Sequence, residues 1–176
     1  MIYLLLTDGF EEIEALTPVD VLRRCGAELT TVGVHGKRVI GAHKIVTEAD
    51  IEISHVKKED MEMLILPGGT GYAGLKTPEV YELIKYAVEN NIVVGAICAA
   101  PSILGEMGIL ENKKATCFPG FESEMKGAVL TDGGVVEDGM FITAKGAGAA
   151  SDFAFALASH VCGKEKASEI KNAMQY

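Results

Sequence analysis

VVGAICAAPSIL, residues 93–104, runs from a β-branched apolar segment through a single cysteine into small residues and a proline. The apolar start predicts the end of a buried strand, because both faces of a strand in a parallel sheet are covered. Pro101 suits the first position of a helix, where its missing N–H removes no hydrogen bond. Cys98 is therefore predicted at a strand-to-helix turn, beside unpaired N–H groups that favour negative charge.

The small residues around Cys98 resemble a nucleophile elbow, a tight turn that excludes bulky neighbours. The pattern alone leaves open whether the thiol is reactive or only packs. Cys25, Cys117 and Cys162 follow no strand at this edge and are predicted to be packing residues with free thiols. No CxxC pair suggests a zinc site or a dithiol redox motif, so no metal is expected.

Strand-like and helix-like segments alternate along the whole chain, which predicts an α/β fold with a doubly wound, mostly parallel sheet. Residues 36–53 have short alternating apolar runs around glycines and predict a small edge hairpin. The expected strands are 2–7, 28–34, 63–69, which ends in a loop, and 92–97, and the expected helices are 11–25, 78–91 and a late alanine-rich segment, 149–163.

Composition limits the class of protein. The chain has 176 residues, which fits one domain over 1–176, and a net charge of -9, which opposes nucleic-acid binding. No apolar tract is long enough to span a membrane, and the first residues, MIYLLLTDG, predict a strand and not a signal peptide. A cytoplasmic protein is expected.

Three features are predicted to meet at the carboxyl edge of the sheet, where ligands bind in doubly wound folds. They are Asp8-Gly9, Pro67-Gly68-Gly69 and Cys98, each directly after a predicted strand. GGTGYAG, residues 68–74, lacks the spacing of a dinucleotide motif and the GK[ST] ending of a phosphate loop. No nucleotide cofactor is therefore expected.

A reactive thiol needs a proton partner, and no histidine follows Cys98 closely. A carboxyl group can serve instead. Glu14 borders the apolar face of the helix predicted over 11–25, where burial raises a carboxyl pKa and a neutral acid can donate to the sulfur. Glu11 also borders apolar neighbours, so periodicity does not choose between the two.

Three stretches together closely resemble the DJ-1/PfpI family, specifically its DJ-1 and bacterial ThiJ-like branch: GFEEIEALTPVDVLRRCG (9–26), LILPGG (64–69) and AICAAP (96–101). The resemblance spans nearly the whole chain. It implies a flavodoxin-like three-layer sandwich, a homodimer, Cys98 as the reactive cysteine and Glu14 as its hydrogen-bonding partner.

The resemblance also implies an activity on reactive dicarbonyls, as a deglycase or glyoxalase without a cofactor, with a small aldehyde or a glycated side chain as substrate. Gly68, Gly69 and Ala99 are then expected to offer backbone donors to an oxyanion. Arg24 and His43 fall where the family presents basic groups, including across a dimer, and are candidate anion-binding residues. His43 stands where the family usually has arginine.

Two departures from the family pattern affect the function. Ala99 stands where PfpI-type peptidases have histidine, which disfavours a peptidase. Phe118 stands where some DJ-1 relatives have a histidine, and core packing is expected of it. The alternative function is a non-enzymatic sensor or redox-regulated chaperone, in which a peroxide oxidises Cys98.

Overall fold

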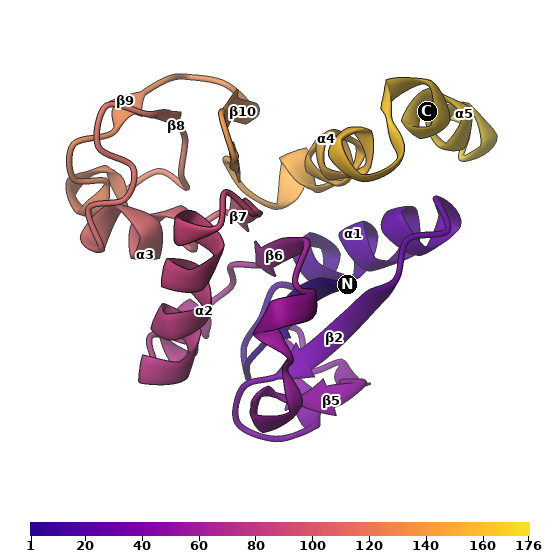
Figure 1. The fold of residues 1–176 in the computed structure, drawn as a ribbon, viewed down its shortest axis with the longest axis horizontal. Coiled ribbons are helices and arrows are strands. Elements are labelled where there is room, and N and C mark those ends of the chain that lie inside the picture. Colours follow the sequence, from indigo (N-terminus) through magenta and orange to yellow (C-terminus); the bar gives the residue numbers. More distant parts are fainter.

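The computed structural model describes residues 1–176 and contains a central seven-stranded sheet with helices on both faces (Figure 1). The strand order is β10-β11-β7-β6-β1-β2-β5, and every neighbouring pair is parallel except β10 with β11. The strands are β1 (Ile2–Leu6), β2 (Leu29–Gly33), β5 (Ile51–Glu52), β6 (Met63–Leu66), β7 (Val93–Ile97), β10 (Val135–Asp138) and β11 (Phe141–Ala144). The predicted doubly wound, mostly parallel sheet is confirmed.

Helices α1 (Glu12–Arg24) and α4 (Ala150–Cys162) lie side by side on one face of the sheet, and α2 (Pro78–Glu89) and α3 (Pro101–Glu106) lie on the other (Figure 1). The last helix, α5 (Lys164–Ala173), packs on α4. Thr77 caps α2 by accepting a hydrogen bond from the N–H of Val80 at 3.3 Å, as a serine or threonine before a helix commonly does. None of these helices has the length and apolar character needed to cross a membrane.

The strand sequences are continuously apolar because each strand contributes side chains to two hydrophobic cores, one on each face of the sheet. Side chains alternate between the two faces of a strand. In β1, Leu4 and Leu6 join the core under α1 and α4, whereas Tyr3 and Leu5 join the core under α2 and α3. All five residues of β1 are buried, as expected for a central strand of a doubly covered sheet.

Two small sheets stand beside the main one. β3 (Arg38–Ile40) pairs antiparallel with β4 (Val46–Glu48) and forms the predicted edge hairpin. The Ile40 carbonyl accepts a hydrogen bond from the N–H of Gly9 at 2.7 Å, which ties the hairpin to the turn after β1. β8 (Lys114–Ala115) pairs in parallel with β9 (Val129–Leu130).

The direction of strand addition reverses at β1, which lies between β2 and β6. Such a switch point leaves a crevice outside the carboxyl ends of the strands. Asp8-Gly9 follows β1, Pro67-Gly68-Gly69 follows β6, and Cys98 follows β7. The predicted meeting of these segments at one edge is confirmed, because a Cβ on Gly69 would lie 2.4 Å from the Gly9 carbonyl oxygen and a Cβ on Gly68 would lie 2.6 Å from the Cys98 Cβ.

Candidate active site

Cys98 occupies a strained turn between β7 and α3. Its φ is 66°, a left-handed conformation that is common for glycine but rare for other residues, apart from asparagine and aspartate. Two hydrogen bonds hold this backbone, from the N–H of Cys98 to the Ala144 carbonyl (2.9 Å) and from the N–H of Phe118 to the Cys98 carbonyl (2.8 Å). The predicted elbow is therefore present as a strand, a tight turn at Cys98 and a helix. A strained residue held in this way is typical of a functional position.

Glu14 lies under the elbow, on the first turn of α1, with only 1% of its surface exposed. Its Oε2 accepts a hydrogen bond from the N–H of Gly68 at 2.9 Å, and its Oε1 has no hydrogen-bond partner among the protein atoms. The carboxyl makes a polar contact with the Cys98 thiol that affects the pKa of both groups. The structure therefore selects Glu14 over Glu11, whose side chain is 18% exposed.

Gly68 separates these two side chains, and only a glycine fits there. A Cβ on Gly68 would lie 2.6 Å from the Cys98 Cβ and 2.8 Å from the Glu14 Oε2. Gly69 has a φ of 107° and would bring a Cβ within 2.4 Å of the Glu11 nitrogen. The PGG loop is thus shaped by its close approach to both α1 and the elbow.

The backbone donors of the loop differ from the expectation in one respect. Gly68, predicted to serve an oxyanion, already donates its N–H to Glu14 and is not free for a ligand. The N–H groups of Gly69 and Ala99 contact the Cys98 sulfur. Those two N–H groups are therefore the backbone donors that face the Cys98 sulfur.

The charges of the pair depend on each other. Burial raises the pKa of Glu14 to about 7, although its contacts with the Cys98 thiol and the Gly68 N–H act in the opposite direction. Burial, followed by the charge of Glu14, raises the pKa of the Cys98 thiol to about 12, and the Gly69 and Ala99 N–H groups oppose that rise. The helix that follows, α3, has only six residues and is a weak source of dipole stabilisation.

This coupling assigns the neutral Glu14, and not the start of α3, the larger part in any thiolate at Cys98. Next to an ionised Glu14 the sulfur keeps its proton, so a thiolate near neutral pH requires the proton to lie on Glu14. A protonated Glu14 can donate a hydrogen bond to the sulfur, which removes the charge repulsion between the two groups. One carboxyl and one thiol then share a single proton.

We expect the buried carboxyl to make stability depend on pH. The folded-state pKa of Glu14, about 7, lies above its ordinary value of 4.5, so its contribution is fully present below pH 4.5 and is lost as pH rises through 7. The loss amounts to about 3 kcal/mol. Urea unfolding of Glu14→Gln should therefore show the variant more stable than the wild type at pH 8 and nearly equal to it at pH 4; an equal difference at both values would contradict the buried charge.

The pair opens into a cavity of about 460 Å³. One wall is aromatic, with Tyr72 and Phe121 in edge-to-face contact at 5.2 Å between ring centroids. The lining residues are Glu11, Glu14, Gly69, Thr70, Tyr72, Cys98, Ala99, Phe118, Phe121 and Ala147. An apolar cavity with a few polar groups at one end suits a small, weakly charged ligand.

Phe118 corrects an expectation. It was predicted to pack in the core, but it is 46% exposed and lines this cavity and a neighbouring one. The preceding residue, Cys117, takes the buried position, so the next side chain points outward. Tyr72 and Thr70 were not predicted as site residues, because the GGTGYAG stretch that contains them matches neither a dinucleotide motif nor a phosphate loop.

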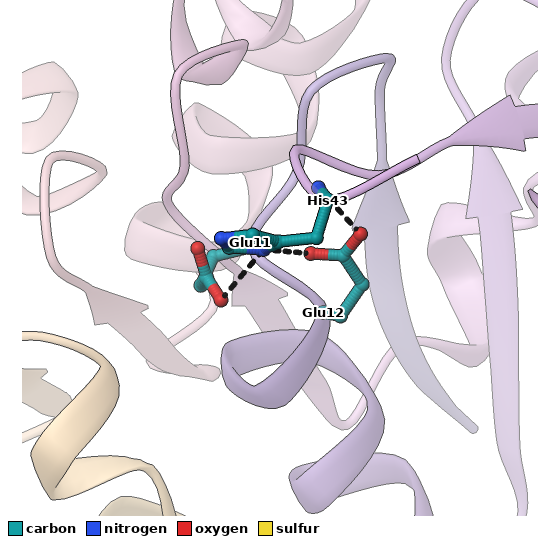
Figure 2. Close-up of side chains that lie close together, drawn as sticks. All are labelled: Glu11, Glu12 and His43. Carbon is teal, nitrogen blue, oxygen red and sulfur yellow. Dashed lines mark hydrogen bonds and ion pairs between the residues drawn. The ribbon is translucent and has the colours of Figure 1, made fainter. Parts of the chain in front are cut away.

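His43 does not present a free cation to the cavity within one chain. Its ring Nδ1 lies 2.8 Å from Glu12 Oε2 and 3.5 Å from Glu11 Oε1, and its backbone N–H donates to Glu12 Oε1 at 2.8 Å (Figure 2). The hydrogen bond to Glu12 raises the pKa of His43. Burial of Glu12 opposes ionisation, but the hydrogen bonds from the His43 ring and from the backbone N–H groups of Glu12, His43 and Ile45 together lower the Glu12 pKa. Within this chain His43 therefore pairs with carboxylates, and its predicted anion-binding role stays a prediction.

The same three side chains bring possible metal ligands within 4.8 Å of one another. Both oxygens of Glu12 are already engaged by His43, which explains the cluster without a metal ion. Glu11 is the member that also lines the cavity.

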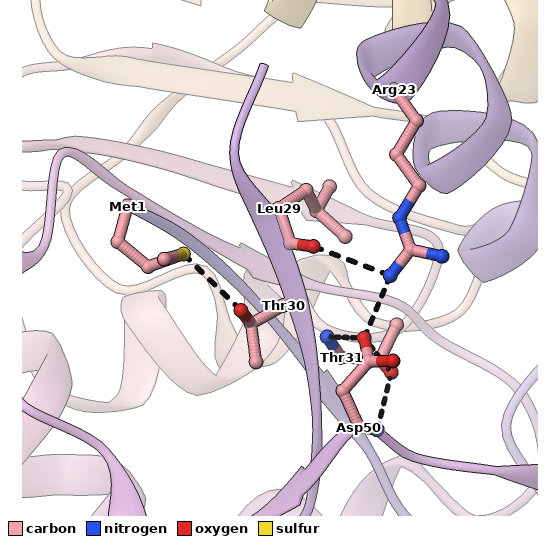
Figure 3. Close-up of polar contacts among 6 residues, drawn as sticks. All are labelled: Met1, Arg23, Leu29, Thr30, Thr31 and Asp50. Atoms are coloured by element: carbon pink, nitrogen blue, oxygen red, sulfur yellow. Dashed lines mark hydrogen bonds and ion pairs between the residues drawn. The ribbon is translucent and has the colours of Figure 1, made fainter. Parts of the chain in front are cut away.

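Arg24 is likewise absent from the cavity in the single chain. It lies at the last turn of α1, the opposite end from Glu14, and pairs with Asp20 at 2.7 Å. Its neighbour Arg23 pairs with Asp50 at 2.7 Å and donates to the Leu29 carbonyl, which fastens α1 to β2 (Figure 3). The predicted anion-binding role of Arg24 is not supported within this chain.

A family model described as the DJ-1/PfpI family matches residues 1–160, and the chain belongs to that family. The glutathione-independent glyoxalase DJR-1.2 of Caenorhabditis elegans is 32% identical over 170 residues, covering 95% of this chain and 91% of the relative. The deglycase TK1284 of Thermococcus kodakarensis is 28% identical over 153 residues, covering 82% of this chain and 89% of the relative.

Solved structures agree with the DJ-1 and ThiJ-like branch and with the flavodoxin-like sandwich. A cysteine-to-alanine mutant of the DJ-1 superfamily protein STM1931 from Salmonella typhimurium superposes with a TM-score of 0.94 at 29% identity, covering 99% of this chain and 97% of that one. Toxoplasma gondii DJ-1, in an oxidized form, also gives a TM-score of 0.94 at 28% identity, covering 99% and 97%.

Proposed function

We propose that this chain converts small 2-oxoaldehydes, such as methylglyoxal, or their early adducts on side chains, to hydroxy acids by nucleophilic catalysis at Cys98. The observation that carries the proposal is the contact between the buried Glu14 carboxyl and the Cys98 thiol at one end of a largely apolar cavity. Two relatives whose names state a glyoxalase and a deglycase support the substrate class.

The first step is addition of the Cys98 thiolate to the aldehyde carbon while Glu14 holds the proton. A C–S bond forms, and the aldehyde oxygen takes up the proton from Glu14 to give a hemithioacetal. The Gly69 and Ala99 N–H groups already face the sulfur, so they are the donors nearest to the oxygen that gains charge.

The remaining steps need no outside oxidant. Ionised Glu14 removes the proton from the former aldehyde carbon and returns it to the neighbouring ketone carbon, while the hemithioacetal hydroxyl proton passes to the ketone oxygen. These two transfers leave a thioester on Cys98 with a hydroxyl group on the neighbouring carbon. Water then cleaves the C–S bond and releases the hydroxy acid. The sum is one dicarbonyl plus one water giving one hydroxy acid, because one carbon is oxidised while its neighbour is reduced.

Lactate formation tests this function directly. The purified wild-type chain, incubated with methylglyoxal at pH 7.5, should form lactate in proportion to protein concentration, measured by a lactate-specific enzymatic assay. The matched blank is the same chain after complete alkylation of its cysteines. A rate equal to the blank at every protein concentration would overturn the proposal.

A second candidate function is peroxide sensing at Cys98, favoured by the same backbone donors. A sulfinate on Cys98 would accept hydrogen bonds from Gly69 and Ala99 and from a protonated Glu14. The oxidized state of the Toxoplasma gondii protein supports this alternative. Mass spectrometry after mild peroxide treatment should place added oxygen mainly on Cys98, and equal oxidation of the four cysteines would count against a sensor.

The proposed assembly is a homodimer. Ile13 on α1 and Ile45 and Val46 on the β3–β4 hairpin are each about half exposed, at 51%, 52% and 51%. An apolar face of this kind is suited to a second copy of the chain. Sedimentation that gave the mass of a single chain at micromolar concentration would contradict the dimer.

A further inference from the structure

Cys25 and Cys162 lie at the ends of two neighbouring helices. Cys25 directly follows α1, and Cys162 is the last residue of α4. The two helices pack side by side and run in the same direction along one face of the sheet, so their carboxyl ends lie together (Figure 1). The fold thus brings together two cysteines that are far apart in the sequence.

The side chains at this helix end are in contact. The Cys25 thiol makes a polar contact with the Cys162 thiol, and both residues are half-buried against the core under α1 and α4. The Cys162 sulfur also lies 3.1 Å from the Ala158 carbonyl oxygen. The Lys166 ammonium group, in α5, is close enough to the Cys25 sulfur to favour its anionic form.

We propose that Cys25 and Cys162 are a dithiol that a peroxide converts to a reversible intramolecular disulfide between α1 and α4. Adjacent thiols on rigid helices need little movement to reach the separation of a bonded pair. The half-buried position admits a molecule as small as hydrogen peroxide.

The chemistry takes place in two steps. The thiolate of one of the two cysteines attacks one oxygen of hydrogen peroxide, the O–O bond breaks, and a sulfenic acid and hydroxide form; the hydroxide takes the released thiol proton and leaves as water. The sulfur of the other cysteine then attacks the sulfenic sulfur, an S–S bond forms, and a second water departs with the proton of that thiol. Two thiols and one peroxide give one disulfide and two waters.

Either sulfur can react with the peroxide first. Burial, followed by contact with Cys162, raises the pKa of Cys25 to about 12, which disfavours the Cys25 thiolate. Once one sulfur is a sulfenic acid, the adjacent position of the other makes the second step intramolecular.

This dithiol is separate from the candidate active site. Cys25 and Glu14 stand at opposite ends of α1, about 16 Å apart along the helix. A Cys98→Ser variant should therefore form the Cys25–Cys162 disulfide as the wild type does. This property separates a failure of the dithiol proposal from a failure of the proposed enzymatic function.

Peptide mapping of the full chain tests the proposal. After treatment with hydrogen peroxide and alkylation of remaining thiols, digestion without reductant should give one cross-linked peptide pair containing Cys25 and Cys162, lost on treatment with dithiothreitol. The same pair should appear in Cys98→Ser and be absent from Cys25→Ser and Cys162→Ser. Recovery of Cys25 and Cys162 as separately alkylated peptides after oxidation, or a bridge to another cysteine, would overturn it.

Thermal unfolding gives a second measurement that needs no substitution to interpret. A disulfide that closes so long a loop should raise the melting temperature of the oxidised wild type on the order of 10 °C, and reductant should reverse the rise. Cys117→Ser, which removes a buried thiol outside the pair, should show the same rise. An oxidised wild type that melts at the temperature of the reduced protein would contradict a bond between the two helices.

Discussion

Replacement of Cys98 by serine is expected to reduce lactate formation from methylglyoxal by at least about a thousandfold, to the buffer background. A serine hydroxyl ionises far less readily than a thiol, and Glu14, with a pKa of about 7, is too weak a base to form an alkoxide. The elbow itself should persist, because the hydrogen bonds of Cys98 to Ala144 and Phe118 involve only backbone atoms.

The control for this variant is Cys117→Ser. Cys117 lies one residue before Phe118, close in sequence to the cavity, but its buried side chain is not among the groups that line the cavity beside Cys98. Its activity, corrected for any loss of folded protein, should stay within about threefold of the wild type. Retention of most activity in Cys98→Ser would show that the sulfur is not the nucleophile.

The fold and the central pair could be predicted because their signals are local. The apolar run before Cys98 and Pro101 after it define a strand, a turn and a helix within a few residues, and the structure has them in that order. Glu14 could be recognised as bordering the apolar face of its helix from periodicity alone. Its selection over Glu11 required the family resemblance, because both residues border apolar neighbours.

The rest of the site depends on contacts between distant segments, which periodicity does not encode. The pairing of His43 with Glu12 arises from the docking of the β3–β4 hairpin on the start of α1. The exposure of Phe118 depends on the path of the chain after β8, where Thr116 and Cys117 are buried and Phe118 points outward. The meeting of Cys25 with Cys162 depends on two helices being neighbours in space, so the thiols were predicted as isolated packing residues.

Glu14→Gln is expected to separate the two roles of the glutamate. The amide can keep the hydrogen bond from Gly68 through its oxygen and donate to the sulfur through its nitrogen, as a protonated Glu14 would. It carries no charge that repels a thiolate, so alkylation of residue 98 by iodoacetamide at pH 7.5 should stay within about threefold of the wild type or become faster. The amide cannot accept or release a proton, so lactate formation should fall by about 10²–10⁴-fold.

The comparison variant is Glu11→Gln. Glu11 lines the same cavity and raises the pKa of Glu14 by its charge, but its neutralisation leaves the proton shuttle in place. Its activity should change by less than about tenfold, with the lower limb of the pH profile displaced toward lower pH because one repelling charge is gone. Equal losses of alkylation and turnover in Glu14→Gln would show that Glu14 only maintains the anionic sulfur. Unchanged turnover in Glu14→Gln would show that Glu14 takes no part in the chemistry. A proton shared between Glu14 and Cys98 requires the third result, loss of turnover with alkylation retained.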